Sequence, residues 1–179
     1  MRIRTIFAIS CSLATIGCAG LREPPALPEA LQAPRHVALH LQAAPRLNVS
    51  ADGQSLALVV RIYKLRQLSA FDSAPFAAFL DPGSEKQALG ADLVEAREVT
   101  LVPGQQIDLD ETVSREAGYI GVAALFRAPA AQRWRVAFPA AEAERNGVTV
   151  GLLACALSAG SGAKAISGPA TMMSSVHCQ

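Results

Sequence analysis

Residues 56–65 read LALVVRIYKL, and this stretch decides the fold class. Every second residue from Leu56 to Ile62 is large and apolar, while the alternate positions include Arg61 and, after Ile62, Tyr63. A period of two places the apolar side chains on one face of an extended strand. The stretch therefore predicts a half-buried β-strand.

The same period recurs along the chain, and glycine and proline separate its repeats. One such turn signal is Pro103-Gly104, between two apolar pairs. Short strands at this spacing predict an all-β fold, a two-sheet β-sandwich of about eight strands. The predicted strands cover residues 36–42, 56–63, 99–101, 107–109, 120–126, 134–138, 148–154 and 171–178.

Residues 67–93 depart from the period of two. Ser73 precedes a proline and indicates a helix start, and Ser84 followed by Gln87 resembles a capping box that Gly90 ends. We therefore expect a short helical insertion that packs on one sheet and contributes phenylalanines to the core. The apolar residues at helical spacing are Phe71, Phe76, Phe79 and Leu80.

Composition excludes several classes of protein. The 179 residues suit one domain, and 51% of them are hydrophobic, which is not the composition of a disordered chain. The chain has 16 Lys+Arg and 15 Asp+Glu, so it lacks the positive charge that binding to a phosphate backbone requires. We therefore expect no nucleic-acid partner.

The N-terminus has the pattern of an export signal. Arg2 and Arg4 precede an apolar stretch, and residues 1–17 are predicted to be a signal peptide. The stretch ends in Gly17-Cys18-Ala19, which resembles the lipobox of bacterial lipoproteins, although Thr15 stands where that pattern has leucine. The resemblance implies that Cys18 is acylated and becomes the first residue of the mature chain. The alternative is a plain secreted protein.

The residue after Cys18 is not the aspartate that retains lipoproteins in the inner membrane of enteric bacteria. The resemblance therefore implies an outer-membrane lipid anchor with the domain facing the periplasm. Residues 18–35 are proline-rich and predict a semi-extended tether, which can span up to about 50 Å. The β-sandwich domain is predicted over residues 36–179.

Cysteine arithmetic predicts a disulfide. Once the signal peptide is removed and Cys18 carries lipid, Cys155 and Cys178 remain. An even pair in an oxidising compartment favours a disulfide over a metal site. The alternative is two buried free thiols.

The sequence shows no site for catalysis, metal or cofactor. The motifs GxGxxG, GxxxxGK[ST], GxSxG, HExxH and CxxC are absent. His36 and His40 would share a face of a strand, but about 13 Å apart, too far to chelate one ion. We therefore expect a protein that is not an enzyme and binds no metal or cofactor.

Several motifs carry a family resemblance. VRIYKL at residues 60–65, YIGVAALFR at residues 119–127 and Trp134-Arg135 follow one another behind a lipobox. In this order they resemble the outer-membrane lipoprotein of the type VI secretion system, the TssJ (SciN) family. The resemblance implies a transthyretin-like sandwich of two four-stranded sheets with a small helical addition. It also implies that the lipoprotein holds the periplasmic C-terminal part of the inner-membrane protein TssM, and through it TssL, at the outer membrane.

The resemblance further implies that the loop between the first two strands, residues 44–54, makes the contact with TssM. Asp52-Gly53 is expected to turn the chain and to leave residues 47–50 at an exposed tip, with Leu47 and Val49 as apolar anchors. The alternative is that Leu47 tucks under the sandwich and closes one end of it. The alternative function is a periplasmic transthyretin-like carrier of a small ligand, which would need an apolar cavity. The predicted partner-binding residues are Leu47, Asn48, Val49, Ser50, Asp52 and Gly53.

Overall fold

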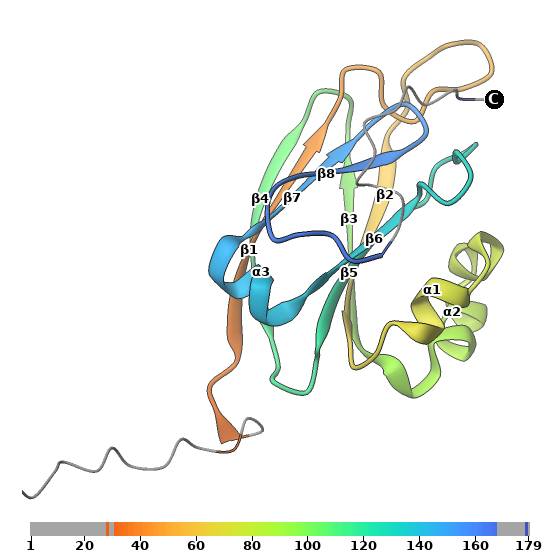
Figure 1. Cartoon of the computed structure of the whole chain (residues 1–179). Coiled ribbons are helices and arrows are strands. Elements are labelled where there is room, and N and C mark those ends of the chain that lie inside the picture. Colours follow the sequence, from red (N-terminus) through yellow and green to blue (C-terminus); the bar gives the residue numbers. More distant parts are fainter. Residues whose placement is uncertain (1–27, 29–30, 168–177, 179) are drawn as a thin grey trace, which may run out of the picture.

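The computed structural model describes residues 28, 31–167 and 178, whose strands form two four-stranded sheets packed face to face (Figure 1). Their strand orders are β4-β1-β7-β8 and β3-β2-β5-β6, which confirms the predicted all-β sandwich. The predicted signal peptide, most of the predicted tether, and residues 171–177 of the predicted last strand lie outside the described residues. The strands are β1 (Arg35–Ala43), β2 (Leu58–Leu65), β3 (Leu93–Leu101), β4 (Gln106–Val113), β5 (Tyr119–Ala124), β6 (Arg135–Pro139), β7 (Val148–Leu152) and β8 (Leu157–Gly162).

Strand β1 is central to the first sheet and is antiparallel to β4 and parallel to β7. Its inward residues Val37, Leu39 and Leu41 are fully buried, and they alternate with polar or small residues on the outer face. This alternation buries one face of the strand, as the period of two predicted.

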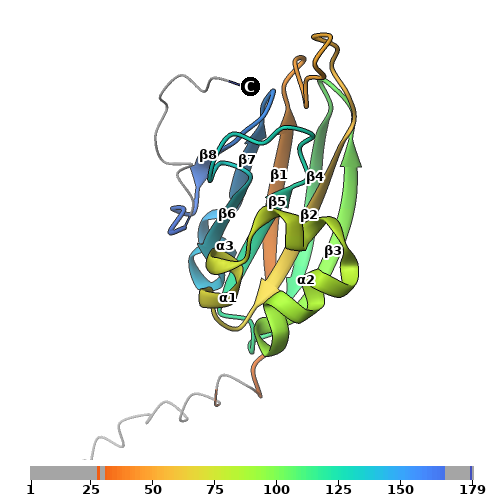
Figure 2. The same ribbon diagram turned by 90° about the vertical axis from the view of Figure 1, so that its right-hand side faces the viewer.

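The second half of strand β2 is buried on both faces, which differs from the half-buried strand that its pattern predicted. Val60 and Ile62 face the other sheet, whereas Tyr63 on the opposite face is also 0% exposed. The cover over that opposite face is the helical insertion, which Figure 2 shows lying across the second sheet. The insertion comprises α1 (Ser69–Ser73), η2 (Phe76–Leu80), α2 (Pro82–Leu89) and η3 (Gly90–Asp92).

Aromatic rings attach the insertion to the sheet. Phe71 and Phe79 are fully buried, and their rings lie 5.4 and 5.9 Å from that of Tyr63 between centroids. Gly121 of β5 permits this packing, because a Cβ there would lie 3.0 Å from the Phe71 ring. The phenylalanines are therefore core residues, as expected.

A polar cluster also fixes the insertion. Arg61 donates hydrogen bonds to Glu85 of α2 at 2.6 Å and to Glu98 of β3 at 2.9 Å. The Tyr63 hydroxyl donates to the other oxygen of Glu85, and burial together with this carboxylate raises the pKa of Tyr63 well above its ordinary value. The outward residues of the VRIYKL motif thus hold α2 on the sheet.

The inward Lys64 of the same motif makes a buried charge contact between the sheets. Its ammonium lies 3.5 Å from Glu111 of β4, which is 2% exposed, and 2.7 Å from Glu95 of β3. Arg97 of β3 lies 2.7 Å from the same Glu111 carboxylate. The β3–β4 side of the sandwich is therefore closed by paired charges, since buried charges need partners.

The helix caps differ from the predicted ones. Asp81, not Ser84, is the N-cap of α2, and its carboxylate accepts a hydrogen bond of 2.8 Å from the Ser84 backbone N–H. Ser73 ends α1 rather than beginning a helix, whereas Gly90 does end α2, with φ of 52°. The backbone hydrogen bond from Ser84 lowers the pKa of Asp81. The cap therefore contributes its full stability to the fold at pH values above the ordinary carboxyl pKa. This contribution is lost as the pH falls through the lowered pKa.

Two elements escaped the sequence prediction. Helix α3 (Ala140–Asn146) buries only Ala140 and Ala143, so it has no stripe of large apolar residues. Strand β8 reads LSAGSG, which is poor in β-formers, and the predicted eighth strand was placed further along the chain at 171–178. Among the described residues no helix is long and apolar enough to cross a membrane.

Candidate functional site: the loop end of the sandwich

Four connections meet at one end of the sandwich, at the top of Figure 1, and we call this surface the loop end. Ala44 joins three of them, because its N–H donates to Leu152 at 2.8 Å and its carbonyl accepts from Gly104 at 3.2 Å. The β1–β2 loop thus lies between the β3–β4 and β7–β8 turns. The loop end comprises residues 44–57, 102–105, 125–134 and 153–156.

Asn48 links three of these segments. Its side-chain amide donates to the Ala57 carbonyl at 2.8 Å, and its side-chain oxygen accepts from the Arg127 N–H at 2.8 Å. Its backbone N–H donates to Leu153 at 3.3 Å. Asn48 is 7% exposed and has φ of 45°, a left-handed conformation that asparagine tolerates better than most residues. Asn48, a predicted partner-binding residue, thus holds the loops together.

Replacing Asn48 with alanine is expected to lower the free energy of unfolding by about 1–3 kcal/mol, because it removes the two part-buried hydrogen bonds to the backbone of Ala57 and Arg127, each worth roughly 0.5–1.5 kcal/mol. Urea unfolding of both proteins measures this loss. Asn48→Gly is the matched control, since it relieves the left-handed backbone without restoring the hydrogen bonds. A stability equal to wild type in both variants would show that this asparagine is not a structural link.

Leu47 is not exposed, and this corrects its prediction as an apolar anchor. Its side chain is 0% exposed and belongs to the core, and its carbonyl accepts a hydrogen bond of 3.0 Å from Leu56. The loop therefore folds back on itself, and Leu47 closes the end of the sandwich. This is the alternative that the sequence left open.

The exposed tip of the loop lies further along the chain than predicted. Residues 51–54 are exposed, whereas Val49 and Ser50 are partly buried. The turn itself lies at Asp52-Gly53 as expected, with Gly53 at φ of 77° and its N–H bonded to the Ser50 carbonyl at 2.9 Å. Asp52 and Gly53 are thus the predicted contact residues that the structure leaves most open to a partner.

Two apolar residues that the sequence analysis missed flank this loop. Val102 is 54% exposed in the β3–β4 turn, and Leu153 is 37% exposed in the β7–β8 turn. Each is the second member of an apolar pair at a strand end, after Leu101 and Leu152, which are both fully buried. Because neighbouring residues of a strand point to opposite sides, one member of each pair faces out. These apolar pairs at the strand ends were the sequence signal that could have identified Val102 and Leu153 as exposed.

The loop end is positively charged. Its four segments contain three arginines and one aspartate, and Arg46 and Arg127 are exposed with Asp52. A partner that pairs with this surface gains from carboxylates opposite the arginines and apolar side chains opposite Val102 and Leu153.

The structure joins Cys155 to Cys178 by a disulfide across 23 residues of sequence. Cys155 is 2% exposed, and its carbonyl accepts a hydrogen bond of 2.8 Å from Ala130 in the β5–β6 loop. Cys178 is exposed. The bridge therefore ties the last described residue to the loop end.

Thiol titration of the denatured, unreduced mature protein is expected to find no free cysteine, because Cys155 and Cys178 are bridged and Cys18 is predicted to be a thioether. Denaturation exposes both positions to the reagent, so burial cannot hide a thiol. A reduced and denatured sample is the control and should give two thiols. A count near two in the unreduced sample would contradict the bridge.

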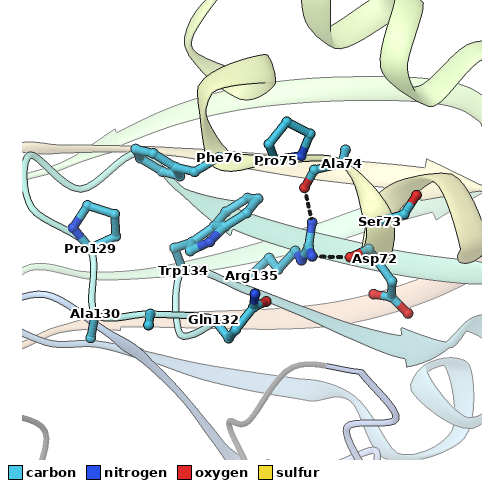
Figure 3. A pocket seen from close by; sticks show the side chains of 11 residues that line it. Asp72, Ser73, Ala74, Pro75, Phe76, Pro129, Ala130, Gln132, Trp134 and Arg135 are labelled. Carbon is cyan, nitrogen blue, oxygen red and sulfur yellow. Dashed lines mark hydrogen bonds between the residues drawn. The ribbon is translucent and has the colours of Figure 1, made fainter.

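A cleft of about 510 Å³ is the candidate for a small-ligand site (Figure 3). Trp134 lies in it, with its ring 5.0 Å from Phe76 and 4.9 Å from Phe79 between centroids. Arg135 donates to the carbonyls of Phe71 and Ala74, both at 2.6 Å, and to that of Asp72. Burial lowers the pKa of Arg135, and its guanidinium lies 4.6 Å from the centre of the Trp134 ring. This arginine anchors α1 to β6, which is a structural task.

The two histidines of β1 lie on the outer face of the first sheet, as predicted. His40 contacts Asp108 of β4 at 2.6 Å, and His36 contacts Asp110 at 3.4 Å. Within residues 31–167 and the two single described positions, no group of three or more His, Cys, Asp or Glu is placed to hold a metal ion.

Comparisons with known proteins agree with this fold. The crystal structure of the type VI secretion lipoprotein TssJ1 from Pseudomonas aeruginosa is 32% identical, with a TM-score of 0.65, over 73% of this chain and 97% of that one. A chain of a structure described as the type VI membrane complex is 29% identical, with a TM-score of 0.64, over 70% of this chain and 97% of that one.

A third similar chain comes from a structure described as the TssM C-terminal domain (869–1107) from EAEC. It is 29% identical, with a TM-score of 0.61, over 70% of this chain and 97% of that one. The comparison with curated proteins finds no match. Residues 35–155 match the family described as "Type VI secretion lipoprotein, VasD, EvfM, TssJ, VC_A0113". This match spans most of the described domain, and the chain therefore belongs to the type VI secretion lipoprotein family.

Proposed function

We propose that this protein is a non-enzymatic lipoprotein that docks the periplasmic C-terminal part of TssM, and through it TssL, at the outer membrane. Its family is one of secretion lipoproteins, and two similar chains come from structures described as the type VI membrane complex and the TssM C-terminal domain. The lipid on Cys18 is the anchor, and the loop end is the docking surface.

The observation that carries the docking role is the pair of exposed apolar residues on a braced surface. Val102 and Leu153 lie on opposite sides of the β1–β2 loop, and the hydrogen bonds of Ala44 and Asn48 hold the three connections together. Exposed apolar side chains that are held in place lose little conformational freedom on binding, and such residues dominate typical interfaces.

The path of the chain supports the same role. Ala33, two residues before β1, accepts a hydrogen bond of 2.6 Å from Arg115, and Arg115 pairs with Glu144 of α3 at 3.3 Å. This contact lies at the end of the sandwich opposite the loop end (Figure 1). A domain anchored through the N-terminal tether thus presents its loop end away from the lipid.

The alternative function, a small-ligand carrier, would use the cleft beside Trp134. The principal charged group of that cleft, Arg135, already bonds three backbone carbonyls of the insertion. A carrier site needs polar groups that converge on the ligand. Docking through the loop end is therefore the function that the geometry favours.

Titration of the purified mature lipoprotein in detergent with the TssM C-terminal periplasmic domain tests the proposal. We expect a saturable complex whose affinity falls as salt rises, because arginines of the loop end contribute. The absence of a complex at low salt, with both proteins folded by circular dichroism, would refute the docking role.

A further inference from the structure

The β7–β8 turn, residues 153–156, is hydrogen-bonded to both neighbouring loops, and we call it the hub of the loop end. The three consecutive carbonyls of Leu153, Ala154 and Cys155 accept hydrogen bonds from the N–H groups of Asn48, Val49 and Ala130, at 3.3, 3.0 and 2.8 Å. The turn also closes on itself, since the Leu153 N–H donates to Ala156 at 2.9 Å. Its geometry therefore sets the position of both neighbouring loops.

This hub carries the disulfide. Cys155 lies within the turn and is bonded to Cys178, near the end of the chain. Leu153, two residues before Cys155, is one of the two exposed apolar residues of the docking surface. The disulfide thus restrains the β7–β8 turn. The same turn accepts the hydrogen bonds from the other loops and carries Leu153.

We infer that the Cys155–Cys178 disulfide is a redox lock on the docking surface, and that oxidation of the two thiols is the maturation step that makes the loop end competent to bind. The inference rests on the proposed function. Loops have fewer buried contacts than strands and open locally at lower free energy, so losing a restraint at their hub loosens them before the sheets. A loosened surface must be reordered on binding, which weakens affinity.

The oxidation needs a disulfide-bearing dithiol oxidase of the periplasm as co-reactant. The thiolate of the exposed Cys178 attacks the oxidase disulfide, which forms a mixed disulfide and releases one oxidase thiol. The Cys155 thiolate then attacks the Cys178 sulfur and releases the second oxidase thiol. The lipoprotein loses two protons and two electrons in all, and the oxidase gains them.

The test compares the oxidised mature lipoprotein with the same protein reduced by a dithiol and capped with iodoacetamide, both in detergent. The mass of the capped protein verifies reduction at both sites. TssM-domain affinity is measured by titration, and local opening by amide hydrogen exchange. We expect at least tenfold weaker binding after reduction. We also expect faster exchange at Asn48, Val49 and Ala130, with unchanged exchange in the β2–β5 ladder.

Two variants complete the design. The double variant Cys155→Ser with Cys178→Ser should behave like the reduced protein without chemical capping. Asp81→Ala is the control, because it removes the N-cap of α2 on the insertion and should leave affinity and loop exchange unchanged.

Affinity within twofold and unchanged loop exchange after reduction would overturn the inference. Exchange that speeds up equally in the loops and in the β2–β5 ladder would also overturn it, since the bridge would then be a general stabiliser. If the oxidised wild-type protein does not bind TssM, the docking proposal fails and the redox lock on docking falls with it. Loop-selective exchange after reduction would then still identify the bridge as a local brace of the loop end.

Discussion

Replacing Cys18 with serine is expected to move the protein from the membrane fraction to the soluble periplasm and to abolish type VI secretion. The acyl chains on a lipoprotein cysteine contribute about 0.8 kcal/mol per buried methylene, and two or more chains give stable anchoring. Serine cannot form the thioether to which the diacylglycerol is attached. Fractionation, palmitate labelling and a secretion assay of the variant measure the effect.

Cys11→Ser is the matched control for this prediction, because Cys11 lies in the predicted signal peptide and should leave anchoring unchanged. Ala19→Asp distinguishes an outer-membrane location of the protein from an inner-membrane one. By analogy with enteric lipoproteins, it should retain the acylated protein in the inner membrane. Membrane-bound and palmitate-labelled Cys18→Ser protein would refute the assignment of the anchor.

Leu153→Asp is expected to weaken TssM binding about 30-fold, roughly 2 kcal/mol, with little change in thermal stability. Leu153 is 37% exposed, so a carboxylate there stays hydrated in the free protein but meets the apolar part of the interface in the complex. Titration of the TssM domain and thermal melts of each variant measure the two effects separately.

Leu47→Asp is expected to show the opposite behaviour. Leu47 is 0% exposed, so its replacement buries a carboxylate without a partner and should lower the melting temperature steeply. Leu80→Asp is the matched control on the surface, because Leu80 is 57% exposed and belongs to the insertion, not to the segments that form the loop end. Weaker binding by Leu80→Asp and normal binding by Leu153→Asp would move the docking surface to the insertion.

The sequence predicted the strands of the fold better than the packing around them. The period of two in β1 and β2 predicted strands and inward faces correctly, because it follows from the geometry of an extended chain. It predicted nothing about what covers the outward face of β2, because Phe71 and Phe79 arrive there from another part of the chain. The helical spacing of the phenylalanines predicted an insertion packed on one sheet, but it did not predict that this insertion would cover β2.

The β1–β2 loop lies at one end of the sandwich, but Leu47, which was predicted to be exposed there, is buried. A leucine in a polar loop has the same composition whether it faces a partner or closes the core, and only the fold distinguishes the two. The backbone hydrogen bond from Leu56 to the Leu47 carbonyl folds the loop back, with the Leu47 side chain in the core. The apolar pairs at the ends of β3 and β7, by contrast, carried the information about Val102 and Leu153 in the sequence itself.

The course of β1 has a mechanical consequence. The strand begins two residues after the Arg115 contact with the tether and ends at the β1–β2 loop, so it runs from the tethered end to the loop end. A pull between the lipid and a partner held at the loop end therefore acts along the length of β1. Its hydrogen bonds to β4 lie across that direction, and a force along the strand loads them together rather than one after another. Under the proposed docking role, tension between the anchor and the partner therefore acts on β1 in shear, the direction in which a paired strand resists separation best.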